Sequence, residues 1–280
     1  MPLDRDRLLS LDVPARRAAY TDRDVMLYAL SVGLGAGEDD LPFVYERGLA
    51  VVPSFATVLA FDDSWLEAGG IDLATVVHGA LDITFARPLA PAGTADVGFS
   101  IAGLADKGPG RGGIVLQEIV IDQDGAPAAT VLSTLFARGG GGFGGSVGRE
   151  APAVALPDRP ADETLRVPTD VRQALLFRLL GDRNPLHADP AVARAAGFDR
   201  PILHGACTFG IACATVLAHF CGHDPARLGR FAARFAGPLY PGETLAFSLW
   251  TMPDGVGFKA HAAERDTIVL DGGFAAVRPA

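Results

Sequence analysis

The sequence has little cysteine, and its three cysteines are not arranged as a disulfide framework. Cys207, Cys213 and Cys221 are an odd number, and all three lie in one apolar run of a 280-residue chain. They are expected to be buried, reduced thiols, as in proteins of a reducing compartment. No Cys/His spacing in the chain suits zinc. The sequence therefore predicts neither disulfides nor a bound metal.

The sequence also lacks a block of positive charge and a long apolar run. Its 24 Lys and Arg are outnumbered by 33 Asp and Glu, which gives a net charge of −9 and argues against nucleic acid as the main partner. No run is long enough to span a bilayer, and the first residues do not form a signal peptide. These absences predict a globular, cytoplasmic protein that binds neither nucleic acid nor a membrane.

What the chain does contain is one short segment rich in catalytic residue types, Gly181-Asp182-Arg183-Asn184-Pro185-Leu186-His187. It places a carboxylate and an imidazole five residues apart on a turn braced by proline. Seventeen residues beyond His187 comes His204, and Gly205 then opens an apolar stretch that is predicted to be a helix to about Cys221. An acid/base pair beside a helix N-terminus is what the addition of water to a polarised carbonyl compound requires.

The chain also repeats itself. The stretch Phe85–Thr94 resembles Phe235–Thr244, at an offset of about 150 residues, which is the size of a small domain. Glycine-rich and then proline-rich sequence separates the two halves and suits a linker. We predict two related domains, 1–148 and 166–280, joined by a linker over 149–165.

Local patterns predict both helices and strands. Thr21 is expected to cap a helix over residues 22–33, and Thr169 is expected to cap a matching helix over 170–180. Most of the chain from 231 to 277 has β-favouring stretches separated by Gly, Pro and Asp turns. This mixture predicts an α+β fold.

The catalytic segment and the sequence that follows it resemble the signature of the MaoC-like, hydratase 2 family of enoyl-thioester hydratases. The family pattern is roughly G-D-x-N-P-[LIV]-H and then G-F-x-x-P-I-[LV]-H-G, and residues 181–187 and 197–205 match every position. The first half carries further family sequence at Phe43–Glu46, Asp106–Gly108 and Phe136–Gly139. The resemblance implies a tandem hot-dog fold, in which each repeat wraps an antiparallel β-sheet around a long central helix.

The catalytic residue types occur in only one of the two repeats. When Tyr28 is aligned with Phe177, the first half has neither the Asp nor the His of the segment. Two-domain members of the hydratase 2 family likewise combine an active C-terminal repeat with a degenerate N-terminal one. We expect the first repeat to accommodate the substrate, with room for a long acyl chain.

The resemblance implies that Asp182 and His187 are the acid/base pair. Their chemistry agrees, because a carboxylate and a neutral imidazole can bracket one water at neutral pH; which group moves which proton stays open. Asn184 is expected to shape the turn or to hydrogen-bond the pair or the thioester. The free backbone N–H of Gly205 is the expected oxyanion donor. His204 is expected to be structural, with its side chain bonded to local backbone.

By the same resemblance, substrate contacts come from both halves. The predicted contacts are His78, Gly79, Lys107, Arg183, Pro185, Leu186 and Phe235. Lys107 stands in a glycine-rich turn, where it is either a partner for a CoA phosphate or a solvated loop charge. No cofactor is expected, because CoA is part of the substrate.

The leading prediction is a hydro-lyase that reversibly hydrates trans-2-enoyl-CoA to (3R)-3-hydroxyacyl-CoA, with the configuration taken from the family. One alternative is a dehydratase of a specialised 3-hydroxyacyl thioester, either bound to a carrier protein or carrying a sterol side chain on CoA. A thioesterase and a non-catalytic acyl-CoA-binding subunit are further alternatives, and the intact Asp182 and His187 argue against the last. Acyl specificity, pathway and oligomeric state, including a homodimer, stay open.

Overall fold

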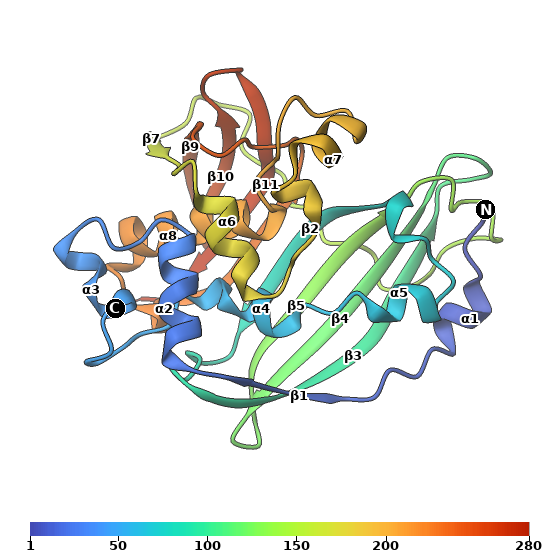
Figure 1. Cartoon of the computed structure of the whole chain (residues 1–280), viewed down its shortest axis with the longest axis horizontal. Helices are drawn as coiled ribbons and strands as arrows, with labels where there is room; N and C mark the ends of the chain where they lie inside the picture. Colours follow the sequence, from blue (N-terminus) through green and yellow to red (C-terminus); the bar gives the residue numbers. More distant parts are fainter. Residues whose placement is uncertain (280) are drawn as a thin grey trace.

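A computed structural model describes residues 1–279, and its strands form one antiparallel sheet that runs through both halves (Figure 1). The strand order is β1-β3-β4-β5-β2-β8-β11-β10-β9-β7, and β6 pairs with β3. The first half supplies β1 (Arg16–Tyr20), β2 (Val76–Phe85), β3 (Gly93–Asp106), β4 (Gly113–Gln123), β5 (Ala126–Ala137) and β6 (Val147–Gly148). The second half supplies β7 (Glu163–Pro168), β8 (Leu228–Phe235), β9 (Thr244–Met252), β10 (Gly255–Ala262) and β11 (Thr267–Val277).

The two halves meet where β2 pairs with β8. Asp82 lies opposite Ala232, and these two residues are 150 positions apart in the sequence, which is the offset of the repeat. The pairs on either side of this one are related by the same offset, since Ala80 pairs with Arg234 and Thr84 with Arg230, as an approximate two-fold axis through Asp82 and Ala232 requires. The Arg230 guanidinium donates two hydrogen bonds to the Asp82 carboxylate across the seam, at 2.8 and 2.7 Å.

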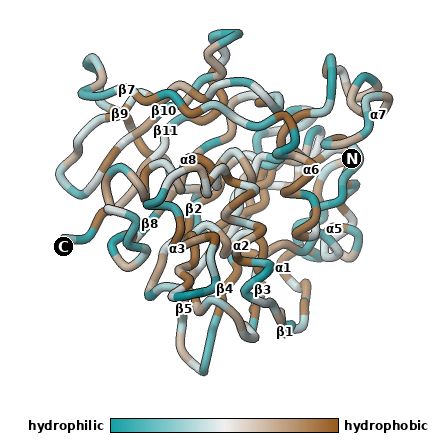
Figure 2. The backbone as a smooth tube through the Cα atoms, turned by 60° about the vertical axis from the view of Figure 1, so that its left-hand side comes forward, coloured by the Kyte–Doolittle hydropathy of each residue, from teal (hydrophilic) through white to brown (hydrophobic). Residues whose placement is uncertain are grey.

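The predicted apolar helix is α8 (Gly205–Cys221), and it is buried along most of its length. It packs against β8 and β11 on one side and against the first half on the other. It ends at Gly222, whose left-handed φ of 59° favours glycine. Its three cysteines are free and buried, as predicted. Figure 2 shows the hydrophobic segments gathered inside the molecule and the hydrophilic ones in the outer turns.

The tandem hot-dog arrangement is confirmed, but the long central helix is present only in the second repeat. The equivalent place in the first repeat holds η2 (Pro53–Phe55) and α4 (Ala56–Ala60). At the end of α4 the Arg16 guanidinium donates to the carbonyl oxygens of Leu59 and Phe61.

The helix predicted over residues 22–33 is α2 (Asp22–Ser31). It begins as predicted at Thr21, whose backbone N–H and hydroxyl both donate to the Asp24 carboxylate.

The matching helix in the second half begins later than predicted, as α6 (Gln173–Phe177) followed by η4 (Arg178–Leu180). Thr169 does not cap it. The Thr169 hydroxyl instead donates to the Glu243 carbonyl oxygen, at 2.7 Å, and accepts from the Gly242 N–H, at 2.9 Å. Hydrogen bonds from Thr169 to the distant β8–β9 turn therefore replace the predicted local cap.

β7 begins at Glu163, inside the predicted linker, so the connection without a helix or strand spans residues 149–162. The domain boundaries themselves stay a prediction, because one main core contains buried residues from both halves. The remaining helices are short: α1 (Arg5–Leu9), η1 (Glu38–Asp40), α3 (Leu41–Val44), α5 (Ser64–Ala68), η3 (Leu73–Thr75), η5 (Pro185–His187), α7 (Pro190–Ala195) and η6 (Pro225–Arg227).

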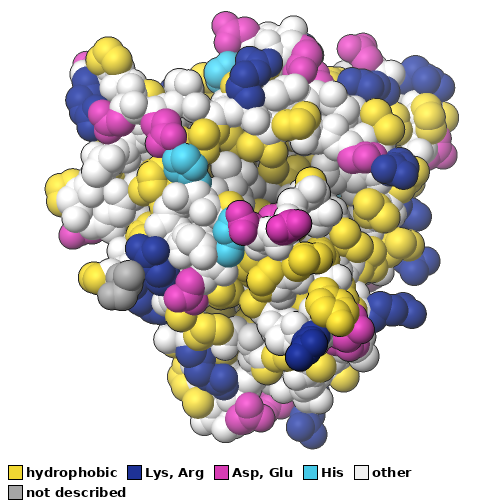
Figure 3. All heavy atoms as spheres, turned by 90° about the vertical axis from the view of Figure 1, so that its left-hand side faces the viewer, with side chains coloured by type: hydrophobic (Ala, Val, Ile, Leu, Met, Phe, Trp, Pro, Cys, Tyr) yellow, Lys and Arg dark blue, Asp and Glu magenta, His cyan; other side chains and the backbone are white. Residues whose placement is uncertain are grey.

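The surface carries scattered charges of both signs. On the side where α2 and α3 lie, apolar patches separate these charges (Figure 3). Leu30, Leu41 and Tyr45 are among the exposed apolar side chains. Within residues 1–279, no helix has the length and hydropathy needed to cross a membrane.

The contact between α8 and α2 requires a glycine at position 210. A Cβ atom there would lie 2.5 Å from Val32 Cγ1 and 2.7 Å from the Tyr28 hydroxyl. We expect Gly210→Ala to lower the free energy of unfolding by about 1–3 kcal/mol through overpacking, measured by urea unfolding. Gly98→Ala is the control, because no atom lies within 4 Å of a Cβ at that position. Equal urea midpoints for the two variants would show that the contact between α8 and α2 can accommodate a Cβ atom at position 210.

Candidate active site

The predicted acid/base segment forms a tight turn between η4 and η5. Gly181 ends η4 with a φ of 132°, a conformation that side chains disfavour. The Asn184 N–H then donates to the Asp182 carboxylate, at 3.1 Å, and the Leu186 N–H donates to Asn184 Oδ1, at 3.0 Å. These bonds, with Pro185 opening η5, hold His187 at a fixed place after Asp182. The Oδ1 atom of Asn184 thus has a turn-shaping role, and its part in the reaction stays a prediction.

His187 is buried, with 8% of its surface exposed. Its Nδ1 lies 2.9 Å from the carbonyl oxygen of Ile202. Because a carbonyl only accepts, Nδ1 carries the proton and donates it, and the neutral ring keeps its lone pair on Nε2. Burial lowers the pKa of His187; the Ile202 carbonyl and the Asp182 charge oppose this effect, and Arg178 adds to it. The arrangement therefore presents a neutral imidazole with a free basic nitrogen.

A third member of the site, His204, has a closer relation to the pair than the sequence indicated. Its Nε2 donates to the backbone carbonyl of Asp182, at 3.2 Å, so its partner is distant in sequence rather than local. Its ring stacks on that of His187, with centroids 3.7 Å apart and planes 29° apart. Burial is the main cause that lowers the pKa of His204 to about 3, so this ring is also neutral near pH 7.

The start of α8 brings residues of both halves together. Gly205 is the first residue of α8, and a Cβ atom there would lie 3.3 Å from the Phe235 ring. The Phe235 ring also lies 5.0 Å from the His78 ring, centroid to centroid. Three predicted site residues, Gly205, Phe235 and His78, therefore lie close together at the seam.

The β2 strand is irregular where it supplies His78. Its pairing with β5 shifts register between His78 and Ala80, so Gly79 forms a bulge. A Cβ atom at Gly79 would lie 3.2 Å from the Thr134 carbonyl oxygen, which leaves little room for a side chain. A hydrogen bond of 2.7 Å joins His78 Nε2 and Ser133 Oγ, and burial lowers the pKa of His78 to about 4.

Lys107 is exposed in the turn between β3 and β4, and no described contact joins it to Asp182 or His187. Its neighbour Asp106 fixes this region, because the Asp106 carboxylate accepts hydrogen bonds from four glycine N–H groups. The four donors are Gly108, Gly142, Gly144 and Gly145, at 2.7–3.2 Å. The bond from Gly142, followed by the bond from Gly108, lowers the pKa of Asp106 to about 2. The glycine-rich run thus anchors the turn that carries Lys107.

Arg178 is a site neighbour that sequence reasoning missed. Its guanidinium donates to the backbone carbonyl of Arg183, at 3.3 Å, and its charge lowers the pKa of both His187 and His204. The predicted contact Arg183 is itself exposed, as is Pro185, and Leu186 is half-buried. No motif marks Arg178, which opens η4 three residues before Gly181.

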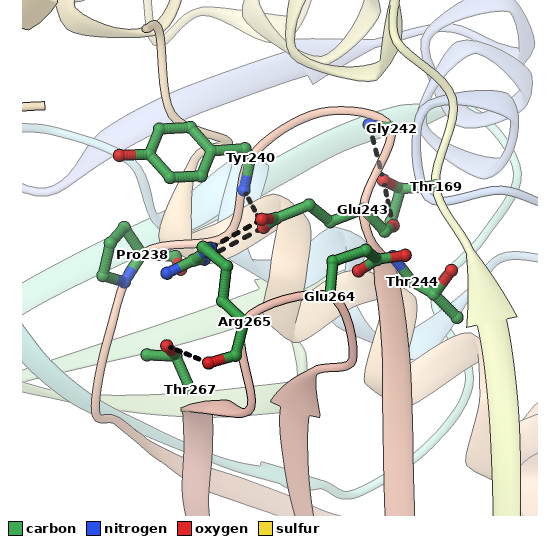
Figure 4. A network of polar contacts seen from close by, with 9 residues as sticks. All are labelled: Thr169, Pro238, Tyr240, Gly242, Glu243, Thr244, Glu264, Arg265 and Thr267. Atoms are coloured by element: carbon green, nitrogen blue, oxygen red, sulfur yellow. Dashed lines mark hydrogen bonds and ion pairs between the residues drawn. The ribbon is translucent and has the colours of Figure 1, made fainter. Parts of the chain in front are cut away.

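A polar network outside the site holds the loop that supplies the Ile202 carbonyl (Figure 4). The Leu203 N–H donates to the Leu239 carbonyl, at 2.7 Å. The turn around Leu239 is fixed by the buried Glu243 carboxylate, which accepts from the Tyr240 N–H, at 2.9 Å, and from the Arg265 guanidinium, at 2.6 and 2.9 Å. Burial alone would raise the pKa of Glu243, but these two donors lower it.

Asp182, His187 and His204 each offer a ligating atom, and these atoms lie within 4.8 Å of one another. One carboxylate and two imidazoles are a donor set that suits zinc. In the structure each imidazole donates its single proton to a backbone carbonyl, as a metal-free acid/base site requires.

The chain is similar to known proteins over both halves. Residues 152–272 match a family model described as a MaoC like domain, and residues 19–139 match one described as the MFE-2 hydratase 2 N-terminal domain. The chain is 41% identical to the 3-hydroxyacyl-thioester dehydratase Y of Mycobacterium tuberculosis, over 91% of each chain. It is 34% identical to the peroxisomal enoyl-CoA hydratase 2 of Arabidopsis thaliana, over 95% of this chain and 93% of the relative. The crystal structure of a MaoC-like dehydratase from Phytophthora capsici superimposes with a TM-score of 0.89, at 30% identity and 98% coverage of both chains.

The buried neutral histidines predict a pH dependence of stability. His204 has a pKa of about 3 in the folded chain and about 6.5 when unfolded. Its contribution is therefore fully present above pH 6.5, and it is lost as the pH falls from there toward 3, because the unfolded chain then binds the extra proton. His204 is expected to contribute about 1.4 kcal/mol per pH unit to the slope, in addition to the contributions of His78 and His187, whose pKa values burial also lowers.

Urea unfolding at pH 7.5, 6.0 and 5.0 measures this slope, in a range where carboxylates with a pKa near 2 do not titrate. His204→Gln removes the titrating ring and should flatten the dependence by about one proton. A slope equal to that of the wild type would mean that His204 is not kept neutral by folding.

Proposed function

The chain belongs to the MaoC-like, hydratase 2 family, and from this membership we propose that Asp182 and His187 catalyse the hydration of trans-2-enoyl-CoA to (3R)-3-hydroxyacyl-CoA. The chain is a hydro-lyase: the names of its relatives, enoyl-CoA hydratase 2 and 3-hydroxyacyl-thioester dehydratase, describe one reversible reaction in its two directions. The observation that carries the residue assignment is the free Nε2 atom of His187, oriented by Ile202 and close to the Asp182 carboxylate.

The proposed reaction uses one water held between Asp182 and His187. The Nε2 atom of His187 takes a proton from the water, and the remaining hydroxide forms the C–O bond at Cβ of the enoyl thioester. The proton then goes from the imidazolium to Cα, so that the product has gained one water. The Asp182 charge favours the transient imidazolium, in agreement with its effect on the pKa of His187.

Gly205 is the proposed oxyanion donor. Its N–H lies in the first turn of α8, where backbone N–H groups have no partner within the helix and the helix dipole is positive. When hydroxide adds to Cβ, negative charge develops on the thioester oxygen, and the Gly205 N–H would stabilise this charge. Protonation of Cα then removes the charge. The absence of a side chain lets Phe235 lie against this helix start, which supports Phe235 as a wall of the site.

The proposed substrate path extends into the first half. His78 and Gly79 would line the acyl-CoA beyond Phe235, and Lys107 would contact the CoA moiety at a greater distance. The exposed Arg183 and the turn residues Pro185 and Leu186 are the proposed contacts beside the pair. A short α4 in place of a long helix supports the prediction that the first repeat leaves room for a long acyl chain.

The reaction changes no oxidation state, so its balance needs no redox cofactor, and CoA enters as part of the substrate. The proposed partner is an acyl-CoA thioester, rather than nucleic acid or a membrane. A cytoplasmic location and a homodimer remain proposals. The relative named 3-hydroxyacyl-thioester dehydratase favours one second candidate, in which a specialised thioester, carrier-bound or sterol-derived, is the preferred substrate.

Loss of the conjugated enoyl-thioester absorbance on mixing the protein with crotonyl-CoA, and then with a ten-carbon enoyl-CoA, tests the function. Chiral analysis of the product tests the R configuration. Thiol release from a saturated acyl-CoA would instead indicate a thioesterase, and tight binding without turnover would indicate a binding subunit.

Removing either member of the pair should abolish most turnover. We expect Asp182→Asn and His187→Ala to lower kcat by about two orders of magnitude or more, because positioned acid/base catalysis carries the step. Asp189→Asn is the matched control: Asp189 caps α7 through the Ala191 N–H, and asparagine caps equally well. Wild-type turnover in either site variant, with circular dichroism unchanged, would refute the assignment.

Lys107→Ala should raise KM for enoyl-CoA with little change in kcat, because a remote phosphate contact contributes equally to ground and transition states. A pantetheine thioester without the nucleotide should show no such difference. Lys107 and Lys259 are the two lysines of the chain, so amine labelling gives a direct check. CoA should protect Lys107, while Lys259, which is 3.5 Å from the Asp271 carboxylate, serves as the internal reference. Equal labelling with and without CoA would make Lys107 a solvated loop charge.

A further inference from the structure

We propose that His204 is a positioning residue, which fixes the catalytic geometry through its contacts with Asp182 and His187 and does not itself touch the substrate. This inference rests on the proposed function of that pair. His204 is 1% exposed, so its side chain has almost no surface with which to meet a ligand. What it offers is a set of contacts to the groups that react.

The first contact fixes the ring of His187. The His204 ring lies between two others, with centroid distances of 3.7 Å to His187 and 4.9 Å to Phe177. His187 is held at one edge by the Ile202 carbonyl, and this single hydrogen bond would leave the ring free to tilt about it. A flat ring stacked on its face removes that freedom and keeps Nε2 aimed in one direction.

The second contact fixes the backbone of Asp182. The His204 Nε2–H donates to the Asp182 carbonyl, at the residue where the chain leaves the strained Gly181. The Asp182 side chain has one bond from the Asn184 N–H. With its carbonyl held as well, the peptide unit that carries the carboxylate is fixed at both ends of the residue.

The third link is covalent. His204 directly precedes Gly205, the proposed oxyanion donor, and it is the N-cap residue of α8. The positions of the base, the carboxylate and the oxyanion donor therefore all depend on the position of one buried ring, that of His204. A displacement of this ring would move the three groups relative to one another, and a misplacement of about 1 Å can cost about 100-fold in rate.

Histidine combines two properties at this place, because its ring stacks on His187 and its Nε2–H donates to Asp182. Phenylalanine can stack but cannot donate to Asp182, and glutamine can donate but stacks poorly. The cost of this choice is visible in the structure: the Nδ1 atom of His204 is buried and has no hydrogen-bond partner among the described residues. A buried polar atom without a partner is destabilising, and its retention fits a role in geometry rather than in stability.

The test compares His204→Phe and His204→Gln with the wild type in steady-state hydration of crotonyl-CoA. We expect both variants to lower kcat by about 30-fold or more with KM within about threefold, because His204→Phe keeps a stacking ring without the donor to Asp182 and His204→Gln keeps the donor without the stack. His219→Gln is the control: His219 is half-exposed on α8 and pairs with Glu163. Wild-type kcat in either His204 variant, or a change confined to KM, would overturn the proposal.

A second measurement does not depend on activity. In ¹⁵N-histidine NMR spectra, wild-type His187 should be one neutral tautomer, protonated at Nδ1. His204→Ala removes the stacked ring and should broaden the His187 ring signals, because the ring gains freedom to tilt about its bond to Ile202 while Nδ1 stays protonated; Asp182 and Arg178 are the other charged groups that face it. His187 ring signals as sharp as those of the wild type would overturn the proposal. A wild type that lacks turnover, with a variant that shows this broadening, would refute the proposed function and leave the positioning role standing.

Discussion

The structure depends on the need to bury most of α8. This helix is apolar around most of its circumference, and a sheet can cover only one side of it. The second half supplies β8 and β11 on one side, and the first half must supply the rest, including Tyr28 of α2 and Val32 just after it, which lie where a Cβ at Gly210 would clash. The two halves therefore share one core. The same constraint places the N-terminus of α8 at the seam between them, where Phe235 and His78 meet Gly205.

Burial also decides the chemistry of the two stacked histidines. An imidazolium is costly to bury, so both rings are neutral, and a neutral imidazole has one proton to donate. Each ring gives that proton to a backbone carbonyl, Ile202 for His187 and Asp182 for His204. The backbone thereby determines which nitrogen of each ring is basic. The Glu243 network acts one step further out, because it holds the loop that contains the Ile202 carbonyl. A tautomer set by main-chain atoms does not change when a side chain rotates.

Much of this arrangement follows from local sequence, and the rest depends on contacts between distant residues. The span of α8, the capping of α2 at Thr21 and the turn at Asp182 are encoded within a few residues, so patterns in the sequence predict them. The Arg16 hydrogen bond at the end of α4 joins residues 45 positions apart, and Thr169 is diverted from its predicted cap by a carbonyl 74 residues later. His204 is placed by a partner 22 residues away and by a ring stack. Periodicity and local motifs carry no information about such partners.

The start of the central helix differs between the two repeats, and this difference explains why the chain has one candidate site. An oxyanion donor needs a helix start with a free N–H. In the second repeat, Gly205 provides it. In the first repeat, η2 begins at Pro53, which has no N–H, and the fully buried Phe55 lies between Tyr20 and Tyr28, with ring centroids 5.2 and 5.5 Å away. Aromatic rings thus fill the position that corresponds to the oxyanion site. The loss of catalytic residues in the first repeat and the closing of its helix start are consistent with each other, since an acid/base pair there would face a packed core.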